Sequence, residues 1–269
     1  MLKLMPRLPL YIAFHRLGRP RLLPFSLVLS VCYRCNSRCR TCNVWKKEAE
    51  ELTLEEWGQI FAHLGRTPFY LTFTGGEPFL RRDLVDLVSL AYEHCRPGVI
   101  TIPTNGLLYN IIPEAVERIL RAAPHAQVGL NLSLDGLGDQ HDHLRGVPGN
   151  YEKALRTYQA LRTLHYPNLT VSIHTVVSRF NVADLPAIYR GLTALEPDSY
   201  ITEIAEERGE LDTVGLDITP SLQEYEPVAD FLIERIKEQR FKGLAHITQA
   251  FRVRYYDLVK RILRQRRQI

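Results

Sequence analysis

Strand-like and helix-like patterns alternate along the chain, and this alternation restricts the possible folds more than any other feature. Apolar runs rich in β-branched residues predict six strands, at residues 25–31, 69–73, 99–102, 127–134, 169–177 and 200–204. A helical pattern, with apolar residues three and four positions apart, follows each of them. Six such βα units in succession predict one sheet of parallel strands with right-handed crossovers.

The number of βα units predicts an open barrel. A closed barrel of eight units takes about 250 residues, whereas the six units here occupy residues 25–240. We therefore expect an α/β protein with a partial (β/α)6, TIM-like barrel of parallel strands. Active sites of such barrels lie where the strands end. Two capping boxes, Thr53 with Glu56 and Ser221 with Glu224, predict the first turns of two helices.

Distinctive segments follow the predicted strands. A cysteine-rich run follows the first strand, GGEP the second, TNG the third and SLDG the fourth. The fifth strand contains His174, which we expect to be an interior histidine with its hydrogen bonds satisfied. The acidic stretch after the sixth strand, from Glu203, is expected to be solvated. Because parallel strands end at one edge of a sheet, these segments predict a functional site there.

The cysteines do not form a disulfide pattern. Four of the five lie in one run, from Cys32 to Cys42, and an odd, clustered set in a chain of 269 residues indicates metal or redox chemistry. Cys35, Cys39 and Cys42 have the spacing C-x3-C-x2-C. Cysteine thiolates hold iron–sulfur clusters. Three thiolates on a four-iron cluster leave one iron open to a small chelating ligand.

Two other interpretations of the cysteine run remain. A zinc site with Cys32 as fourth ligand is one, although closed zinc sites usually draw on two ligand pairs well separated in sequence. A ferredoxin-type electron carrier is the other. Its run is C-x2-C-x2-C-x3-C followed by proline, whereas here the spacing differs and Asn43 follows Cys42.

Together, CNSRCRTC, GGEP, TNG and SLDG resemble the radical S-adenosylmethionine (SAM) superfamily over residues 25–205. The likeness is greatest to members whose barrel is followed by a cysteine-rich (SPASM or twitch-type) extension, whereas this sequence has no cysteine after Cys95. The resemblance implies a partial (β/α)6 barrel, a [4Fe-4S] cluster on Cys35, Cys39 and Cys42, and SAM bound at the open iron.

The resemblance also implies a set of SAM contacts, which are Gly75, Gly76, Glu77, Asn105, Ser133, Asp135 and Arg145. The GGE segment matches backbone that holds the SAM amino group, where glycine permits close approach. The SLDG residues match positions that bind the ribose or carboxylate. The arginine matches one that pairs with the carboxylate through parallel hydrogen bonds. Without the resemblance, these segments are equally typical of plain turns and a surface arginine.

The implied activity is reductive cleavage of SAM to a 5′-deoxyadenosyl radical, which abstracts hydrogen from a peptide, sugar or other metabolite. We identify no catalytic acid or base. Thr41 stands where the family often has an aromatic residue, so no adenine contact is assigned there. Cys32 is expected to be a buried thiol and not a ligand. The alternative function is a non-enzymatic iron–sulfur or zinc-binding module for electron transfer or protein binding.

Both ends of the chain are basic. We expect a basic N-terminal extension (1–24), a radical SAM core (25–240) and a basic C-terminal helical segment (241–269). Solvated helix faces are the favoured interpretation of the basic ends, and an anionic membrane surface or an acidic partner are alternatives. The formal net charge of +4 gives no indication of nucleic-acid binding.

The remaining expectations concern the setting of the protein. No apolar run approaches the roughly 20 residues of a transmembrane helix, and no signal-peptide cleavage site follows the first apolar stretch. We expect a cytoplasmic protein that receives electrons from a small donor such as flavodoxin or ferredoxin. The final residues, 266–269, carry no helix-ending glycine. We therefore expect that the natural protein continues into a domain with further cysteines.

Overall fold

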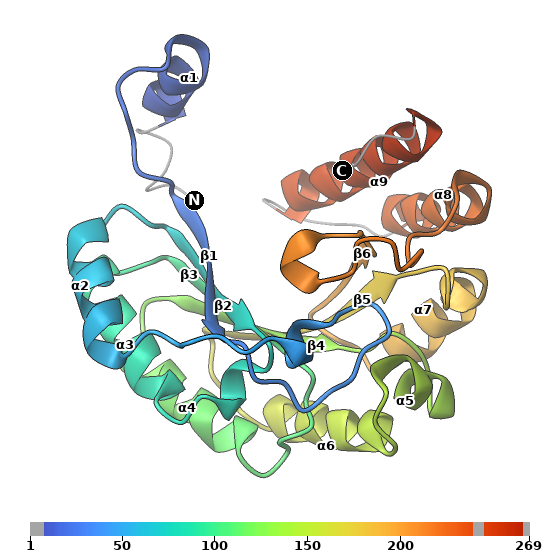
Figure 1. Cartoon of the computed structure of the whole chain (residues 1–269), viewed down its shortest axis with the longest axis horizontal. Helices are drawn as coiled ribbons and strands as arrows, with labels where there is room; N and C mark the ends of the chain where they lie inside the picture. The colour runs from blue at the N-terminus through green and yellow to red at the C-terminus, as the bar shows by residue number, and fades with distance from the viewer. Residues whose placement is uncertain (1–7, 239–244, 266–269) are drawn as a thin grey trace. The chain divides into compact units, whose positions relative to one another are not determined.

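The computed structural model describes residues 8–238 and 245–265. One sheet of six strands has the order β1-β2-β3-β4-β5-β6, and the recorded pairs β1–β2, β2–β3 and β3–β4 are parallel. The strands are β1 (Ser26–Cys32), β2 (Tyr70–Gly75), β3 (Val99–Thr104), β4 (Gln127–Ser133), β5 (Leu169–Val177) and β6 (Ser199–Ile204) (Figure 1). The strand order does not return on itself, so the predicted unclosed parallel α/β sheet is confirmed.

Helices connect the strands. The α-helices are α1 (Leu8–Leu17), α2 (Leu54–Leu64), α3 (Leu84–Cys95), α4 (Ile112–Ala122), α5 (Asp139–Arg145), α6 (Asn150–Arg162), α7 (Leu185–Thr193), α8 (Leu222–Glu238) and α9 (Ala245–Gln265). Short 3-10 turns are η2 (Val44–Lys46), η3 (Pro78–Leu80), η4 (Val182–Asp184) and η5 (Gly209–Leu211). The sequence patterns gave no bounds for α1 and did not predict α5.

The described residues divide into two compact units. Unit 1 comprises residues 8–36, 45–132 and 152–172, and unit 2 comprises residues 37–44, 133–151, 173–238 and 245–265. Each unit is described by itself below.

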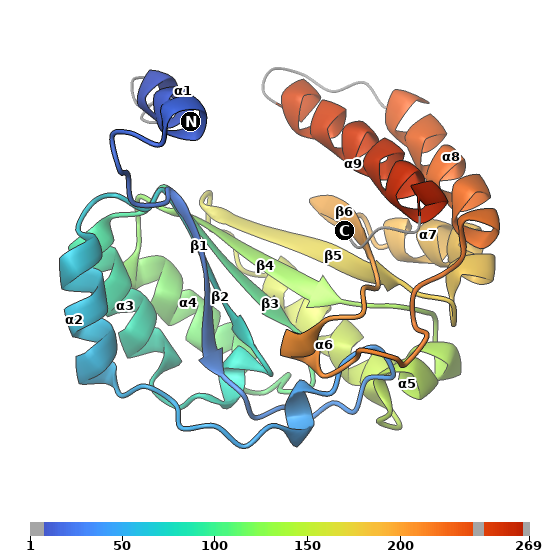
Figure 2. The same ribbon diagram turned by 45° about the horizontal axis from the view of Figure 1, so that its top comes forward.

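In unit 1, α2, α3 and α4 cover one face of β1, β2 and β3 (Figure 2). Phe61 of α2 and Phe73 of β2 are fully buried, and their ring centroids lie 6.5 Å apart. The predicted capping box begins α2: Glu56 Oε2 accepts a hydrogen bond from the Thr53 backbone N–H at 2.8 Å, and Thr53 Oγ1 accepts one from the Glu56 N–H at 3.2 Å. These bonds satisfy amide groups that the first helical turn leaves unpaired.

The end of β1 is irregular. Its register against β2 shifts between Ser30 and Cys32, which makes Val31 an extra residue. The carbonyl oxygen of Val31 accepts a hydrogen bond from Arg81 Nη1 at 3.0 Å. Such bulges redirect a strand where it ends, and here the bulge lies immediately before the cysteine run.

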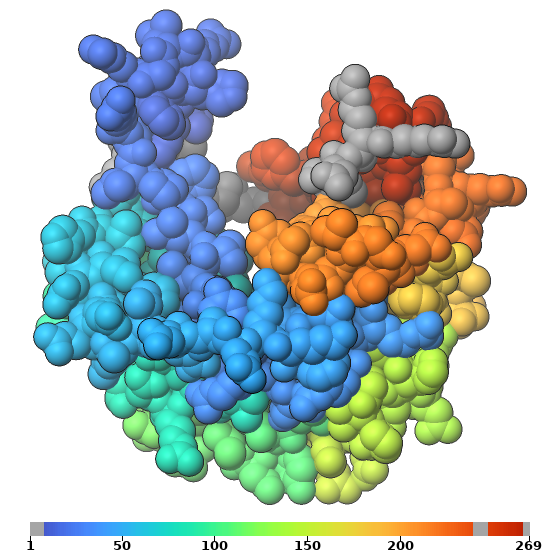
Figure 3. Space-filling view, in the orientation of Figure 1, coloured from blue at the N-terminus to red at the C-terminus, as the bar shows by residue number. Residues whose placement is uncertain are grey.

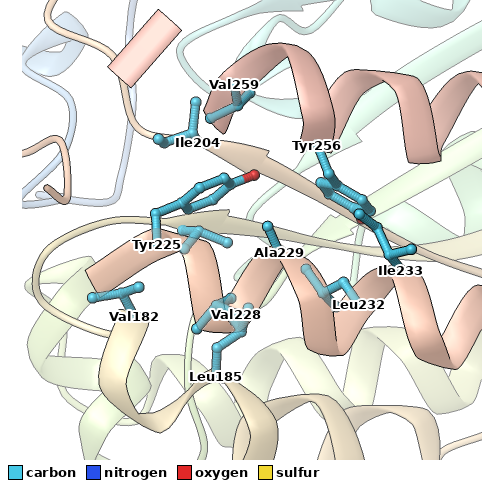
Figure 4. Packing of buried hydrophobic residues seen from close by; sticks show 11 residues of the cluster. Val182, Leu185, Ile204, Tyr225, Val228, Ala229, Leu232, Ile233, Tyr256 and Val259 are labelled. Atoms are coloured by element: carbon cyan, nitrogen blue, oxygen red, sulfur yellow. The ribbon is translucent and has the colours of Figure 1, made fainter. Parts of the chain in front are cut away.

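In unit 2, a hydrophobic cluster joins β5, β6, α7, α8 and α9. Tyr225 and Ala229 of α8 lie between Val182 and Leu185 on one side and Val259 of α9 on the other (Figure 4). The predicted second capping box begins α8, because Glu224 Oε2 accepts from the Ser221 N–H at 2.8 Å and Ser221 Oγ accepts from the Glu224 N–H at 3.3 Å. The side of α8 and α9 that carries these residues is therefore part of the core of unit 2.

Candidate functional site

The three cysteines of the C-x3-C-x2-C motif lie between β1 and η2 and are partly exposed thiols, whereas Cys32 and Cys95 are buried thiols. Cys35 belongs to unit 1, and Cys39 and Cys42 belong to unit 2. Within the described residues, no three His, Cys, Asp or Glu side chains form a group that could hold a metal ion. The assignment of the cluster to these three thiols therefore stays a prediction.

In unit 1, the GGEP segment holds the start of the cysteine run. The Gly76 N–H donates to the Cys32 carbonyl oxygen at 2.5 Å, and the Glu77 N–H donates to the Arg34 carbonyl oxygen at 2.9 Å. A Cβ atom at Gly76 would lie 2.7 Å from the Arg34 carbonyl carbon. Glycine is required here because the two backbones touch.

Glu77 links the GGEP segment to the TNG segment. Its carboxylate is buried and accepts hydrogen bonds from Thr104 Oγ1 at 2.9 Å and from the Asn105 N–H at 2.8 Å. Asn105 in turn donates from Nδ2 to Asn36 Oδ1 at 2.7 Å, and the same nitrogen lies 3.9 Å from Cys35 Sγ. Four of the predicted site residues, Gly76, Glu77, Asn105 and Cys35, are thus brought together in unit 1.

In unit 2, Asp135 and Arg145 form a buried ion pair. Arg145 Nη2 lies 2.8 Å from Asp135 Oδ2, and Arg145 Nη1 lies 3.6 Å from Cys39 Sγ. Burial lowers the pKa of Arg145, but the facing Asp135 carboxylate and Cys39 sulfur outweigh burial, so the pKa is raised overall and the guanidinium stays charged. Arg145 Nε is buried without a hydrogen-bond partner. A buried donor of this kind is costly unless it finds an acceptor.

The segment that carries Cys39 and Cys42 is held by backbone hydrogen bonds in unit 2. The Arg38 N–H donates to the Arg145 carbonyl oxygen at 2.8 Å, and the Arg40 N–H donates to the Leu144 carbonyl oxygen at 3.0 Å. Gly146, with φ of 65°, ends α5, and a Cβ atom there would lie 2.9 Å from Arg38 Cβ. The end of α5 therefore fixes the middle of the cysteine run.

His141 of α5 positions Asp135, and the sequence motifs did not reveal it. Its Nδ1 accepts a hydrogen bond from the Asp135 N–H at 3.0 Å, so Nε2 carries the proton and donates to Asn150 Oδ1 at 3.1 Å. Burial, and then the positive charge of Arg145, lower the pKa of His141 from 6.5 to about 4. Asn181 adds a hydrogen bond from Nδ2 to the Asp135 carbonyl oxygen at 2.8 Å. His141 would have become a candidate only if the sequence had predicted α5 as a helix.

Two further residues of unit 2 lie near the strand ends. Ser133, the last residue of β4, is partly buried. His174 of β5 is partly buried, and its Nε2 has no hydrogen-bond partner and lies 3.6 Å from Glu203 Oε2. Burial lowers the pKa of His174. The expectation of a satisfied histidine is therefore wrong, because Glu203 is mostly exposed and too distant to accept a hydrogen bond.

An unclosed sheet of six sequential strands, with a cysteine run after β1 and glycine-containing segments after β2 and β3, defines a class of α/β protein with a partial TIM barrel. Residues 29–192 match the Radical SAM superfamily. The chain belongs to that superfamily.

Relatives of known activity support this assignment. The chain is 30% identical to the Fe-coproporphyrin III synthase of Methanosarcina barkeri over 81% of this chain and 53% of that protein. It is 33% identical to the mycofactocin maturase MftC of Mycobacterium tuberculosis over 60% of this chain and 40% of that protein. The chain thus spans about half the length of these relatives, and both names are names of enzymes.

A solved structure supports the fold. Streptococcus suis SuiB bound to S-adenosylmethionine has a TM-score of 0.65 at 16% sequence identity, covering 87% of this chain and 52% of that one. Among the residues the structure describes, no helix is long and apolar enough to cross a membrane.

Proposed function

We propose that this chain provides the catalytic core of a radical SAM enzyme, with a [4Fe-4S] cluster on Cys35, Cys39 and Cys42. The observation that carries the proposal is the C-x3-C-x2-C motif directly after β1, inside the region that matches the superfamily. When bound, the cluster and SAM supply reductive cleavage of SAM to methionine and a 5′-deoxyadenosyl radical, which abstracts hydrogen from the substrate. No residue of the chain is proposed as a catalytic acid or base.

The donor chemistry of the residues present fits an iron–sulfur cluster. Three partly exposed thiols supply the soft donors that iron–sulfur clusters require, and the two buried cysteines lie outside the motif. Asn105 Nδ2, at 3.9 Å from Cys35 Sγ, and Arg145 Nη1, at 3.6 Å from Cys39 Sγ, are donors directed at two of the ligand sulfurs. Hydrogen bonds to ligand sulfurs raise the reduction potential of such clusters.

The proposed SAM contacts fall into two groups. The orphaned Arg145 Nε is a donor suited to the SAM carboxylate, with Asp135 holding the same guanidinium in place. The N–H groups of Gly76 and Glu77 are already used within the protein, so we propose that carbonyl oxygens of the Gly75–Glu77 segment accept hydrogen bonds from the SAM ammonium group. Ser133, at the end of β4, remains a proposed contact for the SAM ribose or carboxylate.

The substrate is proposed by analogy only. The relatives include an Fe-coproporphyrin III synthase and a PqqA peptide cyclase from Rhodopseudomonas palustris. These names support a peptide or a tetrapyrrole, and none of them supports a sugar. We further propose a cytoplasmic protein, because thiols stay reduced there, and flavodoxin or ferredoxin as electron donor.

The test is SAM turnover without substrate. The chain, reconstituted anaerobically with iron and sulfide, is mixed with dithionite and SAM, and 5′-deoxyadenosine is measured. We expect slow formation that depends on the cluster and is absent from the Cys39→Ala variant carried through the same steps. A fully reconstituted chain that forms no more 5′-deoxyadenosine than this variant would contradict the proposal.

The alternative is a non-enzymatic iron–sulfur or zinc-binding module. A SAM titration followed by electron paramagnetic resonance of the reduced cluster separates the two functions. Binding at the open iron changes the spectrum, whereas an electron carrier is unaffected. Zinc in place of iron in protein purified without oxygen would instead favour the zinc module.

A further inference from the structure

Helix α1 is mostly apolar, with His15 and Arg16 near its C-terminal end, and yet lies outside the core. None of its ten residues is buried. Five large apolar side chains are exposed, from 38% for Phe14 to 77% for Leu17, and these are Leu8, Leu10, Ile12, Phe14 and Leu17. A mostly apolar helix normally buries its apolar side chains against protein or lipid.

Among the described residues, α1 contacts the segment that follows it. Tyr11 donates a hydrogen bond from its hydroxyl to the Leu23 carbonyl oxygen at 3.0 Å, and its ring meets that of Phe25 edge-on at 5.3 Å. Leu23 and Phe25 are themselves exposed, at 48% and 40%. Figure 3 shows the atoms of α1 projecting from the surface of unit 1. Residues 8–25, which we call the N-terminal arm, therefore form one apolar surface that the described residues leave exposed.

The charge of the N-terminal arm has one sign. Arg16, Arg19 and Arg21 lie among the apolar residues, all three are exposed, and no acidic residue precedes Glu48 in the sequence. The apolar side chains and the cations thus belong to the same short segment. Apolar burial combined with attraction to negative charge is how interfacial helices bind anionic lipid surfaces.

We propose that the N-terminal arm binds the surface of an anionic phospholipid bilayer, with α1 in the interface and Arg16, Arg19 and Arg21 at the headgroups. At ten residues, α1 is half the length needed to span a bilayer. A basic arm without carboxylates fits a negative lipid surface better than it fits a second copy of itself, whose arm carries the same charge. The inference is independent of the proposed SAM chemistry.

Vesicle sedimentation tests the proposal on the full reconstituted chain. We expect the chain to pellet with phosphatidylcholine vesicles that contain phosphatidylserine and to remain in solution with phosphatidylcholine alone. The variant Leu10→Ala/Phe14→Ala/Leu17→Ala should lose binding. The variant Arg16→Gln/Arg19→Gln/Arg21→Gln should bind on the order of a hundredfold more weakly, at about fivefold per cation.

Matched controls lie in the same unit. Ile111→Ala removes an exposed apolar side chain outside the arm, and Arg66→Gln/Arg82→Gln/Arg118→Gln changes the net charge by the same amount at exposed positions. Both should bind like the parent chain. A Phe14→Trp variant adds a direct readout, because its fluorescence should shift to the blue on anionic vesicles. Unfolding curves should be the same for all variants, since the arm has no buried residue.

Three outcomes would overturn the proposal. Equal binding to vesicles with and without phosphatidylserine would show that the cations do not contribute to binding. An equal loss of vesicle binding in the arginine variant and in its charge-matched control would mean that total charge, and not the arm, attracts the lipid. Absence of vesicle binding, with a dimer in sedimentation equilibrium that the Leu10→Ala/Phe14→Ala/Leu17→Ala variant abolishes, would show that a second copy covers α1.

Discussion

The five cysteine side chains fall into two chemical groups. Burial, the largest cause in each case, raises the pKa of Cys32 and of Cys95 to about 11. The nearby Glu51 raises the pKa of Cys32 further, and both thiols donate to backbone carbonyl oxygens, of Arg34 and Phe61, at 3.6 Å. A thiol held in its protonated form is a poor metal ligand, because metals bind the thiolate.

This difference predicts which cysteines the cluster needs. Single Ala substitutions of Cys35, Cys39 or Cys42 should each abolish or strongly reduce the iron content after anaerobic reconstitution. Cys95→Ala should keep the parent iron content and the parent visible spectrum. Cys32→Ala should keep the cluster as well, with a modest loss of stability from the buried site. A normal iron content in Cys39→Ala, or a lost cluster in Cys95→Ala, would reverse the assignment.

His141 makes the stability of unit 2 depend on pH. Its pKa falls from 6.5 to about 4 on folding, so the unfolded chain binds more protons between these values. Stability is then complete above pH 6.5 and decreases as the pH falls toward 4. The decrease is about 1.4 kcal/mol per pH unit, on the order of 3 kcal/mol in all.

Urea unfolding of the cluster-free chain at several pH values checks this contribution. His141→Asn removes the titrating group and keeps an acceptor near the Asp135 N–H. The variant should be less stable than the parent above pH 6.5, and the difference between them should shrink as the pH falls to about 4. His143→Asn, at an exposed position of the same helix, is the control and should follow the parent. Parallel curves for His141→Asn and the parent would contradict the prediction.

Among the helices and strands, those with a strong local sequence pattern were predicted correctly. The β-branched run at Leu169–Val177 predicted β5 to the residue, and the two capping boxes located α2 and α8. Helix α5 escaped prediction because its seven residues, DQHDHLR, contain one apolar side chain and therefore no helical period. The prediction about residues 266–269 falls outside the described residues.

The candidate site was predictable to a similar extent. Spacing alone selected the cysteines, because their arrangement is local in sequence. Asp135 precedes α5 and pairs with Arg145 at the end of that helix. Glu77 follows β2 and accepts a hydrogen bond from the N–H of Asn105, which follows β3. No pattern in the sequence encodes such contacts, so the protein partners of Arg145 and of the Glu77 carboxylate could not be predicted from it.

The junction between the GGEP segment and the cysteine run gives an element-scale prediction. Gly75 has φ of 127°, which only glycine adopts easily, and Gly76 touches the Arg34 backbone. Gly76→Ala should destabilise the chain by about 1–3 kcal/mol, as overpacking does, and should reduce cluster loading by displacing Cys35. Urea unfolding and iron analysis measure the two effects. Gly209→Ala, where a Cβ atom meets nothing within 4 Å, should change neither. A Gly76→Ala chain with parent stability would exclude the close contact.

For the whole molecule, the question is which segments of the chain each compact unit needs in order to fold. The sequence predicted a core over 25–240 and a separate basic segment over 241–269, a division that stays a prediction. In unit 2, however, α9 contributes Tyr256 and Val259 to the same hydrophobic cluster as α8. Tyr255 Oη accepts from the Ile204 N–H at 3.0 Å, and Tyr256 Oη lies 2.7 Å from Thr202 Oγ1. Helix α9 therefore covers β6.

Neighbouring substitutions on α9 measure whether it belongs to the folded unit. Val259 is fully buried, whereas Leu258 is 42% exposed, so the two positions differ in burial while sharing one helix turn. Val259→Ala should lower the free energy of unfolding by about 2 kcal/mol, and Leu258→Ala should change it by less than about 0.5 kcal/mol. Tyr256→Phe should cost about 1–2 kcal/mol, because it leaves Thr202 Oγ1 buried without its partner. Urea unfolding followed by circular dichroism gives all three values. If neither Val259→Ala nor Leu258→Ala changes the free energy of unfolding, α9 is an appended segment and the core of unit 2 is complete without it.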